Sequence, residues 1–138
     1  MFLHFLAERN LTDRFVVDSA GTGGWHVGNP ADRRMQAAAN RRGIQVPSRA
    51  RQISLDDLMD FDLILTMDTA NLSAVRSLSN ETGGHATATI RTMLSFAKDF
   101  NEIEVPDPYY GGEAGFEHVL DLLEDSCSAL LDELTAGE

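Results

Sequence analysis

The stretch Phe61-Asp62-Leu63-Ile64-Leu65-Thr66-Met67-Asp68 decides the fold class of this chain. Its aliphatic centre, Leu63–Leu65, predicts a buried strand. Asp68 then offers a carboxylate that can cap the N-terminus of a helix. The residues beyond it repeat apolar side chains at helical spacing, namely Leu72, Val75 and Leu78. A buried strand that leads directly into an amphipathic helix is typical of an α/β domain.

The alternation of helices and strands continues on both sides of this stretch. In chain order we expect a helix over residues 2–10, a strand over Phe15–Val17, a helix that starts at Asn29-Pro30 and stops at Gly43, a short helix from Ser54 through Met59, a strand over Thr87–Leu94, and a closing helix with the apolar stripe Phe116, Val119, Leu120, Leu123, Cys127, Leu130, Leu131 and Leu134. This order predicts a parallel sheet with helices on both faces, a three-layer αβα domain. At 138 residues, one domain over residues 1–138 is expected.

The composition excludes several classes of function. The formal net charge is −11, which argues against general binding to nucleic acid or to an acidic membrane. The single cysteine cannot form an intramolecular disulfide, so a reducing, cytoplasmic location is expected.

The charge is unevenly distributed along the chain. Residues 99–138 hold 12 of the 22 acids and no Lys or Arg, whereas residues 1–98 hold all 11 basic residues. Six arginines crowd the middle of the chain, at positions 33, 34, 41, 42, 49 and 51. We expect them to pair with the acidic C-terminal segment, and the alternative is a docking patch for an acidic partner.

The loop Val105-Pro106-Asp107-Pro108-Tyr109-Tyr110-Gly111-Gly112 carries a candidate catalytic carboxylate. Two prolines restrict the backbone around Asp107, and a carboxylate held on stiff backbone suits a general acid. Tyr109 and Tyr110 could form aromatic walls for a planar substrate. An ordinary Pro-Asp turn fits the same residues, although the loop follows a strand, where an α/β sheet binds its ligands.

A second loop, Asp18-Ser19-Ala20-Gly21-Thr22-Gly23-Gly24-Trp25-His26, also follows a predicted strand. It matches neither of the glycine patterns of nucleotide-binding loops, so a nucleotide site is not expected. Ser19 could instead hydrogen-bond a neighbouring loop. Trp25 either covers the mouth of a pocket or simply packs.

Cys127 and the histidines yield no further site. Cys127 lies in the apolar stripe of the last helix with carboxylates nearby, and both surroundings raise a thiol pKa, so a core role is expected. The four histidines show no metal-ligand spacing. We therefore predict neither a metal nor another cofactor.

Three motifs of this chain resemble those of the low-molecular-weight protein tyrosine phosphatases. They are Val17-Asp18-Ser19-Ala20-Gly21-Thr22, Trp25-His26-x-Gly28 and above all Asp107-Pro108-Tyr109-Tyr110-Gly111-Gly112. The resemblance covers essentially the whole chain. It implies a phosphotyrosine protein phosphatase I-like fold and hydrolysis of phosphotyrosine proteins or small aryl phosphates through a cysteinyl-phosphate. It also implies that Asp107 is the general acid and base, that Trp25, Tyr109 and Tyr110 line the substrate slot, and that Ser19 supports the phosphate loop.

The resemblance also implies parts that these residues lack. The family carries a first, central strand and a Cys-x5-Arg-Ser/Thr phosphate loop ahead of the helix that residues 1–10 match. Cys127 cannot replace that loop, because Glu133 stands six positions on and would repel phosphate. We therefore expect an N-terminally truncated domain with no nucleophile in this chain. The alternatives are an inactive remnant that binds a partner and, with less support, a relative of the arsenate reductases.

Overall fold

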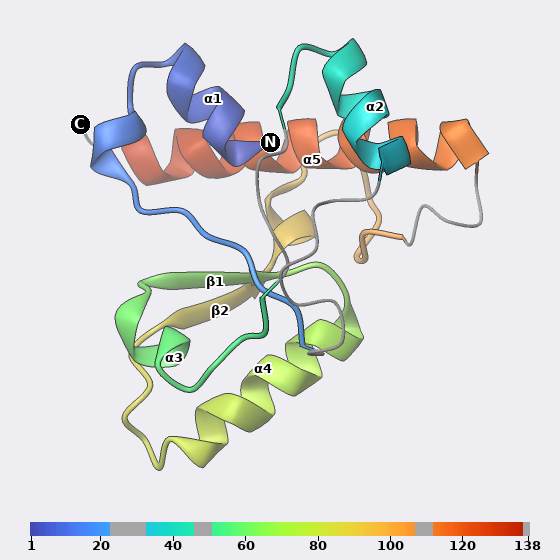
Figure 1. The fold of residues 1–138 in the computed structure, drawn as a ribbon. Helices are drawn as coiled ribbons and strands as arrows, with labels where there is room; N and C mark the ends of the chain where they lie inside the picture. Colours follow the sequence, from blue (N-terminus) through green and yellow to red (C-terminus); the bar gives the residue numbers. More distant parts are fainter. Residues whose placement is uncertain (23–32, 46–50, 107–111, 137–138) are drawn as a thin grey trace.

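The structure, a computed structural model, describes residues 1–22, 33–45, 51–106 and 112–136. Figure 1 shows the fold. Its elements in chain order are α1 (Phe2–Glu8), the 3-10 turn η1 (Thr12–Arg14), α2 (Arg33–Arg41), α3 (Asp57–Asp60), β1 (Leu63–Thr66), α4 (Thr69–Glu81), β2 (Thr89–Thr92), the 3-10 turn η2 (Met93–Phe96) and α5 (Gly112–Thr135).

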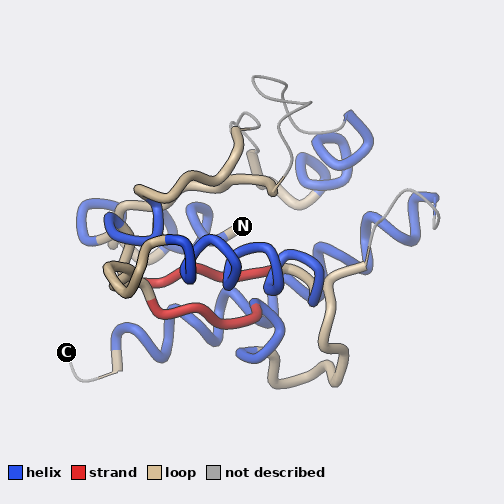
Figure 2. Tube along the Cα trace, turned by 90° about the horizontal axis from the view of Figure 1, so that it is seen from below, coloured by secondary structure: helices blue, strands red, loops and turns tan. Residues whose placement is uncertain are grey.

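The sheet lies between two helical layers. Strands β1 and β2 pair in parallel, with Leu63 opposite Thr89 and Thr66 opposite Thr92. Helix α4 covers one face, and Figure 2 looks at the strands from that side. On the other face, Leu63 and Leu65 pack against the buried cluster that η2 and α5 share. The predicted parallel sheet with helices on both faces is therefore confirmed.

The junction between β1 and α4 forms as its sequence predicts. The backbone of Asp68 is extended, and its carboxylate accepts the Asn71 N–H at 2.7 Å, which satisfies one of the free donors of the first turn. Val75 is buried on α4, which contacts both strands. The strand thus ends, and the helix begins, within three residues.

One predicted strand is wrong. Phe15–Val17 forms no strand, and Val16 is 87% exposed. A strand requires a neighbour to share its backbone hydrogen bonds, and none of the described residues pairs with this segment. Phe15 instead packs edge-on against Phe2 of α1, with ring centroids 5.8 Å apart.

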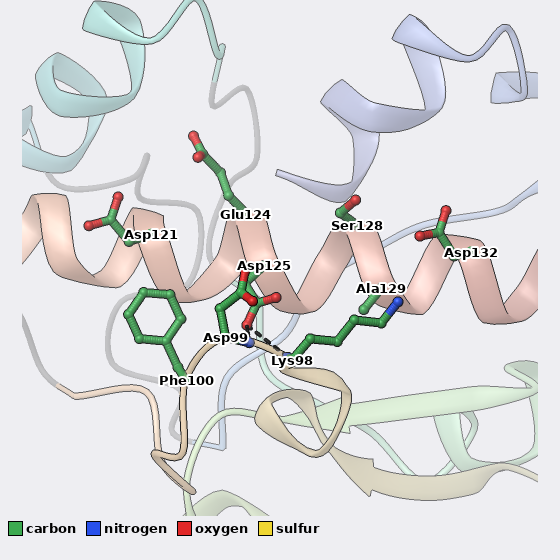
Figure 3. Close-up of a pocket in the computed structure, with 9 residues that line it drawn as sticks. All are labelled: Lys98, Asp99, Phe100, Asp121, Glu124, Asp125, Ser128, Ala129 and Asp132. Atoms are coloured by element: carbon green, nitrogen blue, oxygen red, sulfur yellow. Dashed lines mark hydrogen bonds between the residues drawn. The ribbon is translucent and has the colours of Figure 1, made fainter.

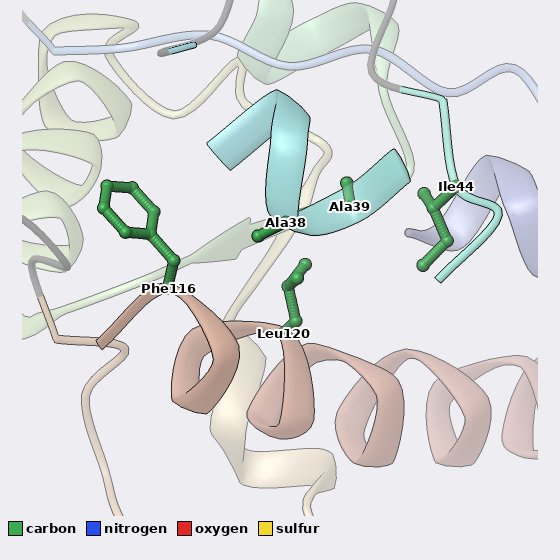
Figure 4. Packing of buried hydrophobic residues seen from close by; sticks show 5 residues of the cluster. All are labelled: Ala38, Ala39, Ile44, Phe116 and Leu120. Atoms are coloured by element: carbon green, nitrogen blue, oxygen red, sulfur yellow. The ribbon is translucent and has the colours of Figure 1, made fainter. Parts of the chain in front are cut away.

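Helix α5 contributes residues to both buried hydrophobic clusters. Most of the predicted stripe is buried, including Phe116, Leu130 and Leu131, but Leu134 is 44% exposed. Its N-terminal half packs on α2 and on Ile44, three residues beyond α2, in a cluster of Ala38, Ala39, Ile44, Phe116 and Leu120, as Figure 4 shows. The positive φ of Gly43, +75°, ends the turn after α2 as expected.

Ion pairs fasten the first two helices to α5. Arg42 reaches three carboxylates of α5, those of Glu117, Asp121 (2.9 Å) and Glu124 (3.0 Å). Burial alone would lower the Arg42 pKa, but the three carboxylates raise it. Arg9, which follows α1, pairs with Asp132 at 2.7 Å. The predicted pairing of arginines with the acidic segment is confirmed for Arg41 and Arg42.

Candidate active site

Ser19 lies on a segment that is held by residues 51–53. Gly21 donates its N–H to the Arg51 carbonyl and accepts the Ile53 N–H, both at 2.8 Å, which makes a short parallel bridge. Ser19 itself is exposed, and its N–H donates to the Asp18 carboxylate at 2.8 Å. The hydroxyl-bearing segment therefore has a fixed backbone.

A charge network reinforces this attachment. Arg51 donates to both carboxylate oxygens of Asp57, at 2.9 and 3.1 Å, and to Asp18 at 3.0 Å. Asp57 is buried and also accepts the Ser54 N–H at 2.8 Å. Hydrogen bonds from Arg51 lower the Asp57 pKa against the opposing effect of burial. The Asp57 carboxylate is therefore held ionised beside the Arg51 guanidinium.

The segment that leads into Asp107 is bound at the carboxyl end of β1. Val105 donates its N–H to the Met67 carbonyl at 2.7 Å. Glu104 accepts the Thr69 N–H at 3.0 Å and also the Thr69 hydroxyl, and these bonds lower the Glu104 pKa. Ligands of α/β sheets bind beyond the carboxyl ends of the strands, so this segment lies where a site is expected.

Most of the predicted site residues lie outside the described part of the chain. These are Trp25, Asp107, Tyr109 and Tyr110. Ser19 is the one predicted site residue that is described. The structure thus defines the two attachments, at residues 18–21 and 104–105, from which the predicted site extends.

Cys127 has the properties of a core residue. It is 5% exposed within the cluster that α5 shares with η2, and burial raises its pKa to about 11. A thiol nucleophile needs a lowered pKa and access to its substrate. The burial and the raised pKa of Cys127 are the opposite of these two requirements.

An open hollow of about 500 Å³ lies between residues 98–100 and α5 (Figure 3). Its charged lining comprises one lysine, Lys98, and five carboxylates, those of Asp99, Asp121, Glu124, Asp125 and Asp132. This excess of negative charge repels a phosphate, so the hollow is unsuited to a phosphomonoester.

No candidate metal site is found in the described part of the chain. Among residues 1–22, 33–45, 51–106 and 112–136, no three or more His, Cys, Asp or Glu side chains are placed so that they could hold a metal ion. Within the same ranges, no helix is long and apolar enough to cross a membrane.

Local sequence predicts one further pair of contacts only in part and another not at all. The Arg51–Asp57 pair was detectable in part, because Ser54-Leu55-Asp56-Asp57 has the spacing of a capping box and Asp57 does bond back to the Ser54 N–H. The contact between Glu104 and Thr69 joins residues 35 positions apart, and no local pattern indicates it.

The chain is similar to known proteins over nearly its full length. Residues 1–138 match the family described as low molecular weight phosphotyrosine protein phosphatase. A putative low molecular weight protein-tyrosine-phosphatase of Synechocystis is 45% identical over 92% of this chain and 80% of its own length. The human low molecular weight phosphotyrosine protein phosphatase is 35% identical over 96% of this chain and 83% of its own length.

Solved structures of other proteins share the fold of this chain. A protein tyrosine phosphatase from Entamoeba histolytica superposes with a TM-score of 0.89 at 38% identity, covering 99% of this chain and 85% of that one. A Drosophila protein described as an arginine phosphatase superposes with a TM-score of 0.90 at 29% identity, covering 99% of this chain and 87% of that one. The family match over the whole chain and these relatives show that the chain belongs to the low-molecular-weight protein tyrosine phosphatase family.

Proposed function

We propose that Asp107 is the general acid and base in phosphomonoester hydrolysis by this domain. A cysteine thiolate attacks phosphorus, the bond to the aryl oxygen breaks, and Asp107 gives its proton to that oxygen. The Asp107 carboxylate then takes a proton from the water that attacks the cysteinyl-phosphate, which releases inorganic phosphate and restores the thiolate. The observation that carries this proposal is the attachment of Glu104 and Val105, directly before the motif, to the carboxyl end of β1.

The proposed substrates are phosphotyrosine proteins or small aryl phosphates. Trp25, Tyr109 and Tyr110 supply aromatic surface, and such surface favours a planar aryl ester over a flexible alkyl phosphate. In this proposal Ser19 supports the phosphate loop through a hydrogen bond, for which its exposed position on an anchored backbone is suitable.

The nucleophile is proposed to come from a phosphate loop that is not among these 138 residues. Cys127 is the only cysteine, it is buried, and its pKa is raised to about 11. We propose that residues 1–138 form a single domain that lacks this loop and is inactive by itself. We propose the cytoplasm as the location of the protein, because a chain with a single, buried cysteine forms no internal disulfide.

The role of Asp107 is tested in a chain that carries a Cys-x5-Arg-Ser/Thr loop ahead of Met1. Asp107→Asn should lower kcat on phenyl phosphate, whose phenolate is a poor leaving group, by roughly 10²- to 10⁴-fold. The loss should be smaller on p-nitrophenyl phosphate, whose p-nitrophenolate leaves more readily without a proton. Asp99→Asn is the matched control, because Asp99 is an exposed aspartate of the same loop region. An unchanged rate in Asp107→Asn removes this residue from the mechanism.

A second candidate function is partner binding without catalysis. The lack of an accessible thiol favours it, and the Tyr109-Tyr110 loop or the arginine cluster would supply the contact. The intact mass of the native protein distinguishes the two candidates, since a mass near 15.1 kDa means that cells make the 138-residue form. Arsenate reduction has less support, because it typically uses additional redox cysteines.

A further inference from the structure

The strap, which we define as residues 98–106, is fastened at both ends. At its start, Asp125 of α5 accepts the N–H groups of Lys98 and Asp99 at 2.9 and 3.0 Å, which Figure 3 shows as dashed lines. Further along, Glu102 contacts His118 Nε2 at 2.9 Å. These contacts attach the first part of the strap to α5.

The second part of the strap is attached to the end of β1 and to the start of α4. Val105 donates to the Met67 carbonyl at 2.7 Å, one residue past the end of β1. The Glu104 carboxylate accepts two bonds from Thr69, the first residue of α4. Bonds to a charged acceptor are stronger than neutral ones, and the partial positive charge of a helix N-terminus adds to them.

This second attachment is close in sequence to the proposed acid. Glu104 precedes Asp107 by three residues, and Val105 precedes it by two. Pro106 and Pro108 restrict the backbone in between and beyond, so few rotatable bonds separate the attachment from the carboxylate. A displacement of Glu104 is therefore expected to displace Asp107 as well.

We infer that Glu104 and Thr69 form a clasp that holds the residues leading into Asp107 at the junction of β1 and α4, and that this attachment positions the proposed acid. Glu104 and Thr69 are positioning residues, and the catalytic consequence rests on the proposed role of Asp107. The clasp consists of a side chain from the strap and the first residue of α4, so it couples the strap to the same helix N-terminus that Asp68 caps.

The chain offers a specific probe for this clasp. Its two tyrosines, Tyr109 and Tyr110, both lie in the Asp107 motif. The ¹⁹F NMR spectrum of the 138-residue protein labelled with 3-fluorotyrosine therefore reports on that motif alone. We expect Thr69→Val, which removes the hydroxyl, and Glu104→Gln, which removes the charge, to shift both tyrosine resonances. The Val105 amide should exchange roughly tenfold faster in both variants.

Two controls separate positioning from general disturbance. Thr69→Ser keeps the hydroxyl and should restore the native spectrum. Glu102→Gln makes the same chemical change on the same strap, two residues away, and should leave the tyrosine resonances in place. Native tyrosine resonances in Thr69→Val, equal shifts in Thr69→Val and Thr69→Ser, or an equal shift in Glu102→Gln would each overturn the clasp.

A kinetic arm keeps the clasp and the proposed function distinguishable. In a chain supplied with the phosphate loop, Thr69→Val should lower kcat on phenyl phosphate by about fivefold and leave KM unchanged, because general acid catalysis depends on geometry. Shifted resonances with an unchanged kcat overturn the positioning role. A rate that Asp107→Asn does not change contradicts the proposed function, whatever the fluorine spectra show.

Discussion

The substitution Asp57→Asn tests the network that holds the Ser19 segment. The Asp57 side chain is 12% exposed and accepts two bonds from Arg51 and one from the Ser54 N–H. Asparagine keeps the volume but removes the charge and one acceptor. Arg51 would then keep only Asp18 as a charged partner, and Ser54 would lose its charged acceptor.

The expected cost is about 2–3 kcal/mol in the free energy of unfolding. Breaking a fully buried pair costs about 3–5 kcal/mol. The value here is lower, because the Arg51 side chain is 33% exposed and retains Asp18. At about 2.1 cal/mol/K per residue, 138 residues give an unfolding entropy of about 0.29 kcal/mol/K, so Tm should fall by about 7–10 °C.

Thermal and urea unfolding followed by far-UV circular dichroism measure this cost, with Asp56→Asn as the matched control. Asp56 is the exposed neighbour of Asp57, and its side chain makes no capping bond. A loss below about 0.5 kcal/mol, or a loss equal to that of Asp56→Asn, refutes the reasoning, since exposed substitutions typically fall in that range.

The pH dependence of this loss has a defined sign. The folded pKa of Asp57 is lowered, chiefly by Arg51. Its stabilisation is therefore complete above the ordinary aspartate pKa near 3.9 and is lost as the pH falls through the lowered value. The difference between the native protein and Asp57→Asn should be constant from about pH 5 to 7 and narrow below about pH 4.

Three further predictions concern the core, the thiol and the helix contacts. Leu131→Ala, at a wholly buried position, should cost about 2–5 kcal/mol in urea unfolding, whereas Leu134→Ala, 44% exposed, should cost under about 1. Equal costs contradict the assigned burial. Cys127 should react with Ellman's reagent at pH 8 only after denaturation, since it is buried with a pKa of about 11, and fast labelling of the native protein contradicts this. Arg42→Ala should cost about 1–3 kcal/mol, reduced by salt, against under about 1 for Arg41→Ala, and the same urea titration checks both.

Local sequence predicts those parts of the fold that local interactions determine. The end of β1 and the start of α4 follow from a buried aliphatic run and one capping aspartate, Asp68, and both form as predicted. Phe15–Val17 has the same apolar character but is not a strand, because strand formation depends on a neighbouring edge that local sequence does not contain. Leu122 is wholly buried although it lies beside the predicted stripe, since a helix packed between several elements buries a wider face.

The candidate site shows the same division. The Asp107 motif predicts its chemistry through its resemblance to the family, and this stays a prediction, because residues 107–111 lie outside the described part of the chain. The attachments that hold its flanks cannot be derived in this way, because Glu104 bonds to Thr69 and Arg51 bonds to Asp18 only once distant segments have packed. Such contacts depend on the relative placement of a strand end and a loop, which no local pattern specifies.

The phosphatase assay of the purified 138-residue protein tests the central claim most directly. The claim is the proposal that this member of the phosphatase family takes its nucleophile from outside these residues, and the buried state of Cys127 supports it. We expect hydrolysis of p-nitrophenyl phosphate at the same background rate in the native chain and in Cys127→Ala. Turnover above background that Cys127→Ala abolishes would contradict the claim, because it would make the buried thiol the nucleophile.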